Sequence, residues 1–391
     1  MGDVVIVGIG QTPVGEHWEL SLRSLAAKAI QAARKDSRQA VGDLQPGAMY
    51  IGNFLAPTVS RQANLGALLT DNLGLRGLES YTLEAAEASG AAAFRQGYLA
   101  VASGFVDCAI VVGVEKCTDA IGANLETAAA EAMDYDYEGM YGLTNTALAA
   151  LLMQRYLHEY QLPRTSLSGF PLLAHANAVN NPNAMFRRAI SFELYERGAR
   201  ISDPLNMFDQ APLADGAAAV ILTRSELADK TVDHPLVRVV GSSNVVDSLS
   251  LHDRDDLLAF EAAGLSLQRA CRQAGILPTD TDFFELTDNF SIYAALSLEA
   301  GGFADRGEGW KLAREGMLNL DGEMPICTLG GAKGRGNPIG ATGLYQIVEA
   351  VQQLRGEAGK SQVPDAHRAL VQSLGGPAST AITHVLEKVE K

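Results

Sequence analysis

Three short segments carry residue types that could do chemistry where a strand gives way to a helix. Glu84–Gly90 (EAAEASG) places Glu87 just before an alanine-rich stretch, Glu285–Phe290 (ELTDNF) contains Asp288, and Leu329–Gly343 (LGGAKGRGNPIGATG) is rich in glycine. A carboxylate at a helix N-terminus can act as a general base, or it can simply cap the helix at the positive end of its dipole. Glycines let backbone approach a ligand closely. These segments are therefore the first candidates for a functional site.

The four cysteines are Cys108, Cys117, Cys271 and Cys327, and they show no metal-ligand spacing. We predict no metal site and reduced thiols in a cytoplasmic protein. The chain has no long apolar run and begins without a secretory signal pattern. Cys327 alone lies in one of the three segments. It is read as a buried spectator thiol or, alternatively, as a displaced nucleophile.

The net charge of −15 argues against nucleic-acid binding through a general basic surface. An anionic ligand would need local cations or helix N-termini. Arg187 and Arg188 could meet phosphates, or could form an ordinary solvated loop face. Gly8-Ile9-Gly10 is not a dinucleotide loop, because Pro13 stands where the third glycine belongs.

Strand-like and helix-like stretches alternate along the chain, which predicts an α/β fold with a mainly parallel sheet. The same order of small-residue turn, helix and buried strand occurs near Ser89 and near Gly340, a weak sign of internal duplication. We predict one half over residues 1–235 and a second over residues 236–391. An insertion or lid is expected at about 118–209.

In order and spacing, the three segments resemble the thiolase superfamily, closest to its archaeal-type and sterol-carrier-protein-type branch. Gly375–Gly376 and Phe208–Ala217 fit the same pattern, so the resemblance covers nearly the whole chain. It implies a thiolase fold, in which two similar βαβαβ-type halves form a layered α/β/α/β/α core. It also implies a site where helix N-termini of the two halves meet, with backbone at Gly376 and Ser89 binding a thioester oxyanion.

The sequence departs from the thiolase pattern at the catalytic positions. Glu87 stands where the family has its nucleophilic cysteine, while Thr287 and Asn337 replace histidines. Ser373 and Cys327 stand where a second cysteine and an asparagine are usual. A carboxylate cannot form an acyl-thioester intermediate, and threonine and asparagine cannot shuttle protons near neutral pH. Standard thiolase activity is therefore not expected, and Glu87, Thr287, Asp288 and Asn337 are the predicted catalytic set.

The resemblance also implies that coenzyme A is substrate or ligand. Its predicted binding residues are His175 and Asn177 in the insertion, Arg187, and the pair Gly330 and Gly331. A homodimer is expected. A small zinc-ribbon and OB-fold protein or a thiolase paralogue is a further possible partner.

Three functions stay open at this point. The first is non-covalent acid–base chemistry on a carbon–carbon bond, such as aldol, retro-aldol or decarboxylation, with Glu87 in the central role. The second is a catalytically inactive subunit that supports an active thiolase or a 3-hydroxy-3-methylglutaryl-CoA synthase. The third is an acyltransferase that uses Cys327. Thiolase-like proteins that resemble steroid side-chain aldolases also lack the cysteine, but they have a characteristic tyrosine at the position of Thr287. Tyr293 and Tyr345 could substitute for it, although each is more typical of a core or wall residue.

Overall fold

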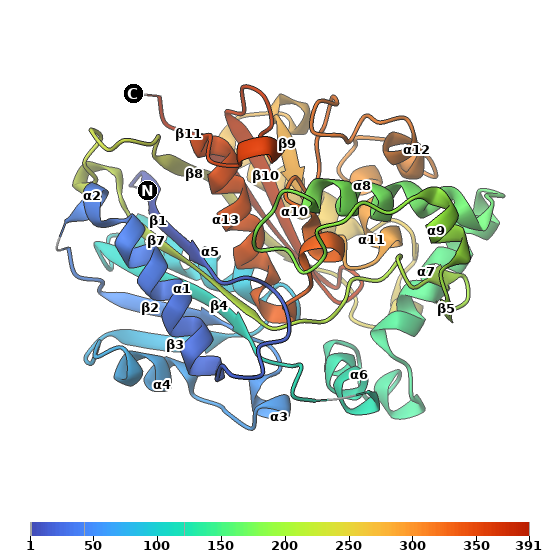
Figure 1. Ribbon diagram of the computed structural model, residues 1–391, viewed down its shortest axis with the longest axis horizontal. Coiled ribbons are helices and arrows are strands. Elements are labelled where there is room, and N and C mark those ends of the chain that lie inside the picture. The colour runs from blue at the N-terminus through green and yellow to red at the C-terminus, as the bar shows by residue number, and fades with distance from the viewer. Residues whose placement is uncertain (1, 43, 121, 391) are drawn as a thin grey trace.

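The computed structural model describes residues 2–42, 44–120 and 122–390. Two groups of strands stand side by side, with the helices of residues 123–197 along one flank (Figure 1). The strands are β1 Val4–Gln11, β2 Ala48–Gly52, β3 Glu79–Leu83, β4 Cys108–Glu115, β5 Arg200–Ser202, β6 Leu205–Asn206, β7 Gly216–Arg224, β8 Val237–Val246, β9 Phe283–Glu285, β10 Arg368–Gly375 and β11 Thr380–Lys388.

Nine of these strands form one sheet in the order β3-β2-β4-β7-β1-β8-β11-β10-β9. Read outward from its middle, β1-β7-β4-β2 in one half matches β8-β11-β10-β9 in the other. In both halves the outer pairs are parallel and the inner pairs are antiparallel. The halves join where Val5 and Ile6 of β1 pair with Arg238 and Val237 of β8. The sheet thus repeats one topology twice. The prediction of a mainly parallel sheet is wrong, because most of the strand pairs are antiparallel. The predicted boundary at residues 235 and 236 stays a prediction.

The helices are α1 Leu22–Asp36, α2 Arg38–Val41, α3 Ala56–Val59, α4 Leu65–Asn72, α5 Ser89–Ala102, α6 Ala123–Ala129, α7 Asn145–Glu159, α8 Gly169–Ala178, α9 Phe192–Arg197, α10 Glu261–Ala274, α11 Ser291–Ala300, α12 Gly309–Arg314 and α13 Thr342–Arg355. Within the described residues, no helix has the length and apolar character needed to cross a membrane.

Two central helices, α5 and α13, pack against each other and contact strands of both halves of the sheet. Helix α1 covers the outer face of the first half, and α10 covers the outer face of the second. This produces the predicted α/β/α/β/α layering. The buried residues of α1 recur at helical spacing along one face of the helix. Ser21 caps the N-terminus of α1, where its hydroxyl accepts a hydrogen bond from the backbone N–H of Ser24.

Glycines allow the two central helices to approach closely, because a Cβ at Gly343 would lie 2.6 Å from the backbone nitrogen of Ala91. Gly343→Ala should therefore lower the free energy of unfolding by about 1–3 kcal/mol, the usual cost of overpacking a core. Urea denaturation measures it. Gly15→Ala is the matched control, since a Cβ there meets nothing within 4 Å. Equal unfolding midpoints for the two variants would contradict the close approach.

Candidate functional site

Glu87 lies in the turn that leads from β3 into α5, directly before Ala88, the N-cap residue of that helix. The preceding residue, Ala86, has a left-handed backbone with φ 51°. Five non-glycine residues of the second half also have positive φ, and three of them lie in or beside its glycine-rich turns: Cys327 (46°), Ile339 (36°) and Ala378 (61°). Strained backbone of this kind is costly and clusters at functional sites. The second half reaches Glu87 at one of these turns, through the backbone N–H of Gly376.

The Glu87 carboxylate is buried and held from two sides. Its Oε2 accepts a hydrogen bond from the backbone N–H of Gly376 at 2.8 Å, and its Oε1 accepts one from Asn145 Nδ2 at 3.2 Å. Burial raises the pKa of Glu87 above the usual carboxyl range, while the Gly376 N–H works against that rise. Both N–H donors favour the ionised form, so Glu87 can take up and release a proton at a fixed position.

A small cavity of about 30 Å³ lies against Glu87, and four side-chain amides line it, those of Asn145, Gln210, Asn289 and Asn337. A pocket of about 1400 Å³ adjoins it, and Glu126, Thr146, Gln210, Ala211 and Leu213 line both. The small cavity has room for a single small group, whereas the pocket is large enough for a long ligand. Glu87 therefore lies at the inner end of a ligand-sized opening.

Asn337 also lines the small cavity, as the motif reading expected. Its Oδ1 accepts hydrogen bonds from the backbone N–H of Ile339 at 3.1 Å and the hydroxyl of Thr342 at 2.8 Å. Since Oδ1 must accept from the Ile339 N–H, the Nδ2 group is the part that can donate to a ligand. Asn289 lines the same cavity. Asn337 thus offers the small cavity a hydrogen-bond donor that does not titrate.

Thr287 and Asp288 have contacts typical of positioning residues. The Thr287 hydroxyl accepts a hydrogen bond from the Leu374 N–H at 3.0 Å and donates to Gln372 O at 3.2 Å, which ties its loop to β10. Asp288 accepts a 2.6 Å hydrogen bond from the Ala332 N–H. Neither Thr287 nor Asp288 is among the described residues that line the two cavities. Their direct catalytic roles stay predictions.

The two predicted oxyanion donors are both engaged within the protein. The Gly376 N–H donates to Glu87, and the Ser89 N–H donates to Ala86 O at 3.1 Å. The Ser89 hydroxyl accepts from the Ala85 N–H and donates to Ala86 O. Ser89 thus holds the turn that carries Glu87, and Gly376 can reach a ligand only if the carboxylate moves.

Of the residues predicted to bind coenzyme A, His175 and Arg187 line the large pocket. Burial lowers the pKa of His175, and the charge of Lys333 adds to that effect. Asn177 instead donates through Nδ2 to Ile326 O and Cys327 O, each at 3.2 Å.

The predicted glycine pair packs tightly against protein atoms. A Cβ at Gly330 would lie 2.6 Å from Ala178 Cβ, and one at Gly331 would lie 2.5 Å from the Asp288 carboxylate. Gly330, Gly331 and Asn177 therefore shape the wall behind the pocket. Direct contact of these three residues with coenzyme A stays a prediction.

All four cysteines are buried, and none of them is among the described residues that line the two cavities. Burial raises the pKa of Cys327 far above the usual thiol range, and the charges of Asp288 and Glu285 raise it further. A thiol becomes a nucleophile as the thiolate, so these surroundings oppose the displaced-nucleophile reading.

The two candidate tyrosines differ in their surroundings. Tyr345 is a core residue whose hydroxyl donates to Thr12 O at 3.0 Å. Burial raises the pKa of Tyr293 above its usual range, and the charge of Glu87 adds to that rise. Tyr293 is thus the tyrosine that interacts electrostatically with Glu87.

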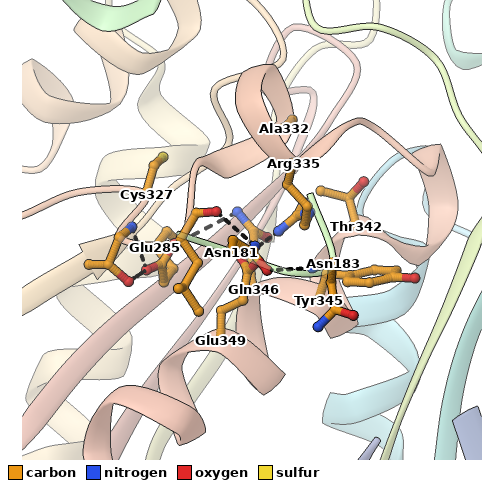
Figure 2. Close-up of polar contacts among 12 residues, drawn as sticks. Asn181, Asn183, Glu285, Cys327, Ala332, Arg335, Thr342, Tyr345, Gln346 and Glu349 are labelled. Carbon is orange, nitrogen blue, oxygen red and sulfur yellow. Dashed lines mark hydrogen bonds and ion pairs between the residues drawn. The ribbon is translucent and has the colours of Figure 1, made fainter. Parts of the chain in front are cut away.

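A cluster of buried charges lies next to the glycine-rich turn (Figure 2). Arg335 Nη1 lies 2.5 Å from Glu349 Oε2, and both side chains are fully buried. The Arg335 guanidinium also lies over the Tyr345 ring, 5.1 Å from its centre. Glu285 accepts hydrogen bonds from the Thr328 N–H and hydroxyl. These contacts fix the backbone that carries Asn337.

Sequence reasoning gave no individual role to Asn145, Gln210, Asn289 or Lys333, all of which line a cavity. Asn145 begins α7, after Thr144, which caps that helix. The capping residue predicts the helix start, but not that the next side chain reaches Glu87. For Lys333, the visible signal in the sequence was a cationic residue inside a glycine-rich segment.

Comparison with protein-family models gives two matches that together span most of the chain. Residues 4–201 match the N-terminal domain of thiolase, and residues 243–388 match the thiolase C-terminal domain-like family.

Curated relatives agree with these matches. The acetyl-CoA acetyltransferase of Methanothermobacter thermautotrophicus is 38% identical over 99% of this chain and 100% of its own length. A benzoylsuccinyl-CoA thiolase subunit of Thauera aromatica is 31% identical over 95% of this chain and 94% of its own length. Sterol carrier protein 2 of Bos taurus is 29% identical over 97% of this chain and 71% of its own length.

Solved structures share the fold. The Ltp2-ChsH2(DUF35) aldolase superposes with a TM-score of 0.84 at 24% identity, covering 100% of this chain and 99% of that one. The acetyl-CoA acetyltransferase of Syntrophomonas wolfei superposes with a TM-score of 0.74 at 16% identity, covering 99% of each chain.

Proposed function

The chain belongs to the thiolase family, and on that premise we propose that it cleaves or forms a carbon–carbon bond next to a coenzyme A thioester without a covalent intermediate. Glu87 is the acid–base group. The observation that supports this most is its buried carboxylate, which lines the small cavity beside the large pocket. The motif resemblance aligns Glu87 with the family's cysteine.

In the retro-aldol direction, the substrate is a 3-hydroxyacyl-CoA. The Glu87 carboxylate takes the proton of the 3-hydroxyl group, the C2–C3 bond breaks, and its electrons form the thioester enolate while C3 becomes a carbonyl carbon. Protonated Glu87 then returns the proton to C2, which gives a shortened acyl-CoA. The Asn337 Nδ2 group donates to the enolate oxygen, where negative charge develops.

Asn145 positions the carboxylate in this scheme. Asn145→Ala removes a hydrogen bond to the ionised form of Glu87, so the pKa of Glu87 should rise further. We expect kcat/KM to fall by about ten- to a hundredfold, because hydrogen bonds to charged groups contribute about 1.5–3 kcal/mol. The pH at which activity rises should also move upward. Asn145→Asp, which brings a like charge, should move it further still, and an unchanged pH profile in both variants would contradict the positioning role.

The second candidate is a partner subunit without catalysis of its own. It is favoured by one contact, because Glu87 occupies the Gly376 N–H that would otherwise bind an oxyanion. The partners would be a cysteine-bearing thiolase paralogue, a 3-hydroxy-3-methylglutaryl-CoA synthase or a small zinc-ribbon and OB-fold protein. The Ltp2-ChsH2(DUF35) aldolase is named for two components, which fits a partnered enzyme equally well. A homodimer and a place in lipid metabolism are part of the proposal.

Turnover of a panel of 3-hydroxyacyl- and 3-oxoacyl-CoAs by the native chain and Glu87→Ala separates the candidates. The proposed enzyme releases a carbonyl compound and a shorter acyl-CoA, and the variant does not. Intact-mass measurement in the same samples should find no acylated protein. An adduct on Cys327 would instead establish the acyltransferase reading. A native chain that binds acyl-CoA yet turns over none of the panel, while it captures a thiolase paralogue, would establish the partner subunit.

A further inference from the structure

Lys333 is a buried cation in the wall of the large pocket. It lies in the π-helical turn Gly331–Arg335, only 1% of its surface is exposed, and it is among the residues that line the pocket. Its Nζ donates a hydrogen bond to the backbone oxygen of Asp209, a neutral acceptor. Burial lowers the pKa of Lys333 to about 8, while Asp288 and Asp209 oppose that change, so the ammonium form prevails at neutral pH.

Other buried cations of this chain are paired with carboxylates. Lys116 lies 2.9 Å from Asp215, Arg335 lies 2.5 Å from Glu349, and Arg355 lies 2.8 Å from Asp36. Within the described part of the chain, Lys333 has no carboxylate within 4 Å of its Nζ.

The two nearest acids are committed to other contacts. Asp288 accepts from the backbone N–H groups of Ala332 and Lys333. Asp209 accepts from Tyr195, Asn206 and Ser291. A buried ammonium that no carboxylate contacts directly is costly, and binding of an anion next to it lowers that cost.

The position of Lys333 indicates which part of a ligand it meets. Asp209, its hydrogen-bond acceptor, is followed by Gln210, which lines both the large pocket and the cavity of Glu87. Arg187 and Arg188, which line the same pocket, are exposed. Phosphates are strongly hydrated and suit exposed arginines. A buried ammonium, in a pocket that the apolar rings of Phe186 and Phe208 also line, suits a group that leaves water.

We infer that Lys333 is the counter-ion for an anionic group on the acyl part of the thioester, so that the preferred ligand is an acyl-CoA with a carboxylate on its acyl chain. This inference rests on the proposed function, because it requires the acyl-CoA to bind in this pocket. It adds a substrate class and a specificity-determining residue that the motifs do not contain.

Calorimetric titration with matched thioesters tests it. Succinyl-CoA and butyryl-CoA have four acyl carbons each and differ in one carboxylate. The malonyl/propionyl and glutaryl/pentanoyl pairs change the distance between the thioester and the carboxylate. The native chain should bind at least one dicarboxylic member tighter than its neutral match by on the order of tenfold or more. In Lys333→Met that preference should vanish, while affinity for free CoA and for the neutral thioesters stays within about twofold.

Methionine keeps the length of the lysine stem and removes the charge, so the variant should fold, and Lys333→Gln provides a second neutral side chain. Equal affinity within every pair for the native chain overturns the inference and leaves the proposed function standing. An equal loss for CoA, neutral and dicarboxylic thioesters in the variants also overturns it, since Lys333 would then bind phosphate. If no CoA compound binds the native chain, the proposed function and the inference fall together.

Discussion

Replacing Glu87 with glutamine should lower kcat for cleavage of a 3-hydroxyacyl-CoA by about 10²- to 10⁴-fold, the range that a positioned acid–base group contributes. Glutamine has the same length, and its oxygen can still accept from the Gly376 N–H that now holds the carboxylate. It cannot take up the hydroxyl proton. The KM for the thioester should therefore change little, because the large pocket is untouched.

The pH dependence provides the control for this variant. Burial raises the pKa of Glu87, and the base must be ionised, so native activity should rise with pH through that raised pKa. Protonation of Glu87 stabilises the folded state fully at a pH below the ordinary carboxyl pKa. This stabilisation is lost as pH rises through the pKa that Glu87 has in the folded state. Glu87→Gln should thus gain stability relative to the native chain as pH rises from the ordinary carboxyl pKa through the raised pKa of the folded state. Retained activity in a folded variant would exclude Glu87 as the base.

Arg335→Met should be the most destabilising single change near the site, with a loss of about 3–5 kcal/mol in the free energy of unfolding. The substitution leaves the buried Glu349 without its ion-pair partner (Figure 2). Burial raises the pKa of Glu285 and of Asp288, and the substitution also removes a charge that opposes this rise. Burial raises the pKa of Glu349 to about 8, and the charge of Arg335 is the effect that opposes the rise. Without it, Glu349 must take up a proton to remain buried.

The double variant Arg335→Met/Glu349→Leu should recover most of that loss, because an apolar pair of similar volume can replace a buried ion pair at little cost. Denaturant unfolding of the native chain and of the single and double variants gives the coupling between the two positions. Arg76→Met is the control, since its ion pair with Asp71 is exposed and contributes little. A double variant no more stable than Arg335→Met would contradict the claim that the loss comes from leaving Glu349 buried without its cation.

Much of the fold follows from local signals in the sequence. Alternating buried strands and helices predicted the α/β class, and the Ser21 cap fixed the start of α1. Boundaries were less accurate where tertiary packing intervened. The amphipathic spacing of Leu257–Ala274 predicts a helix that starts at Leu257. Helix α10 instead begins at Glu261, because Phe260 adopts a left-handed backbone with φ 44°.

The motifs brought the right segments together but did not indicate which side chains face the ligand. Glu87 meets Asn145, 58 positions along the chain, and Gly376, 289 positions along it. No periodicity encodes such contacts. Thr287 and Asn337 occupy equivalent positions in the motif reading, yet only Asn337 lines the cavity, because the Thr287 hydroxyl is taken up by β10.

Exchange of α-protons tests the central claim most directly, because it needs no knowledge of the carbonyl co-substrate. Acetyl-CoA and longer acyl-CoAs are incubated with the protein in D₂O, and loss of the signal of the protons on the carbon next to the thioester is followed by proton NMR. A carboxylate base at that carbon predicts deuterium incorporation catalysed by the native chain and abolished in Glu87→Gln. Equal incorporation with both proteins, or a protein that becomes acylated instead, would contradict it.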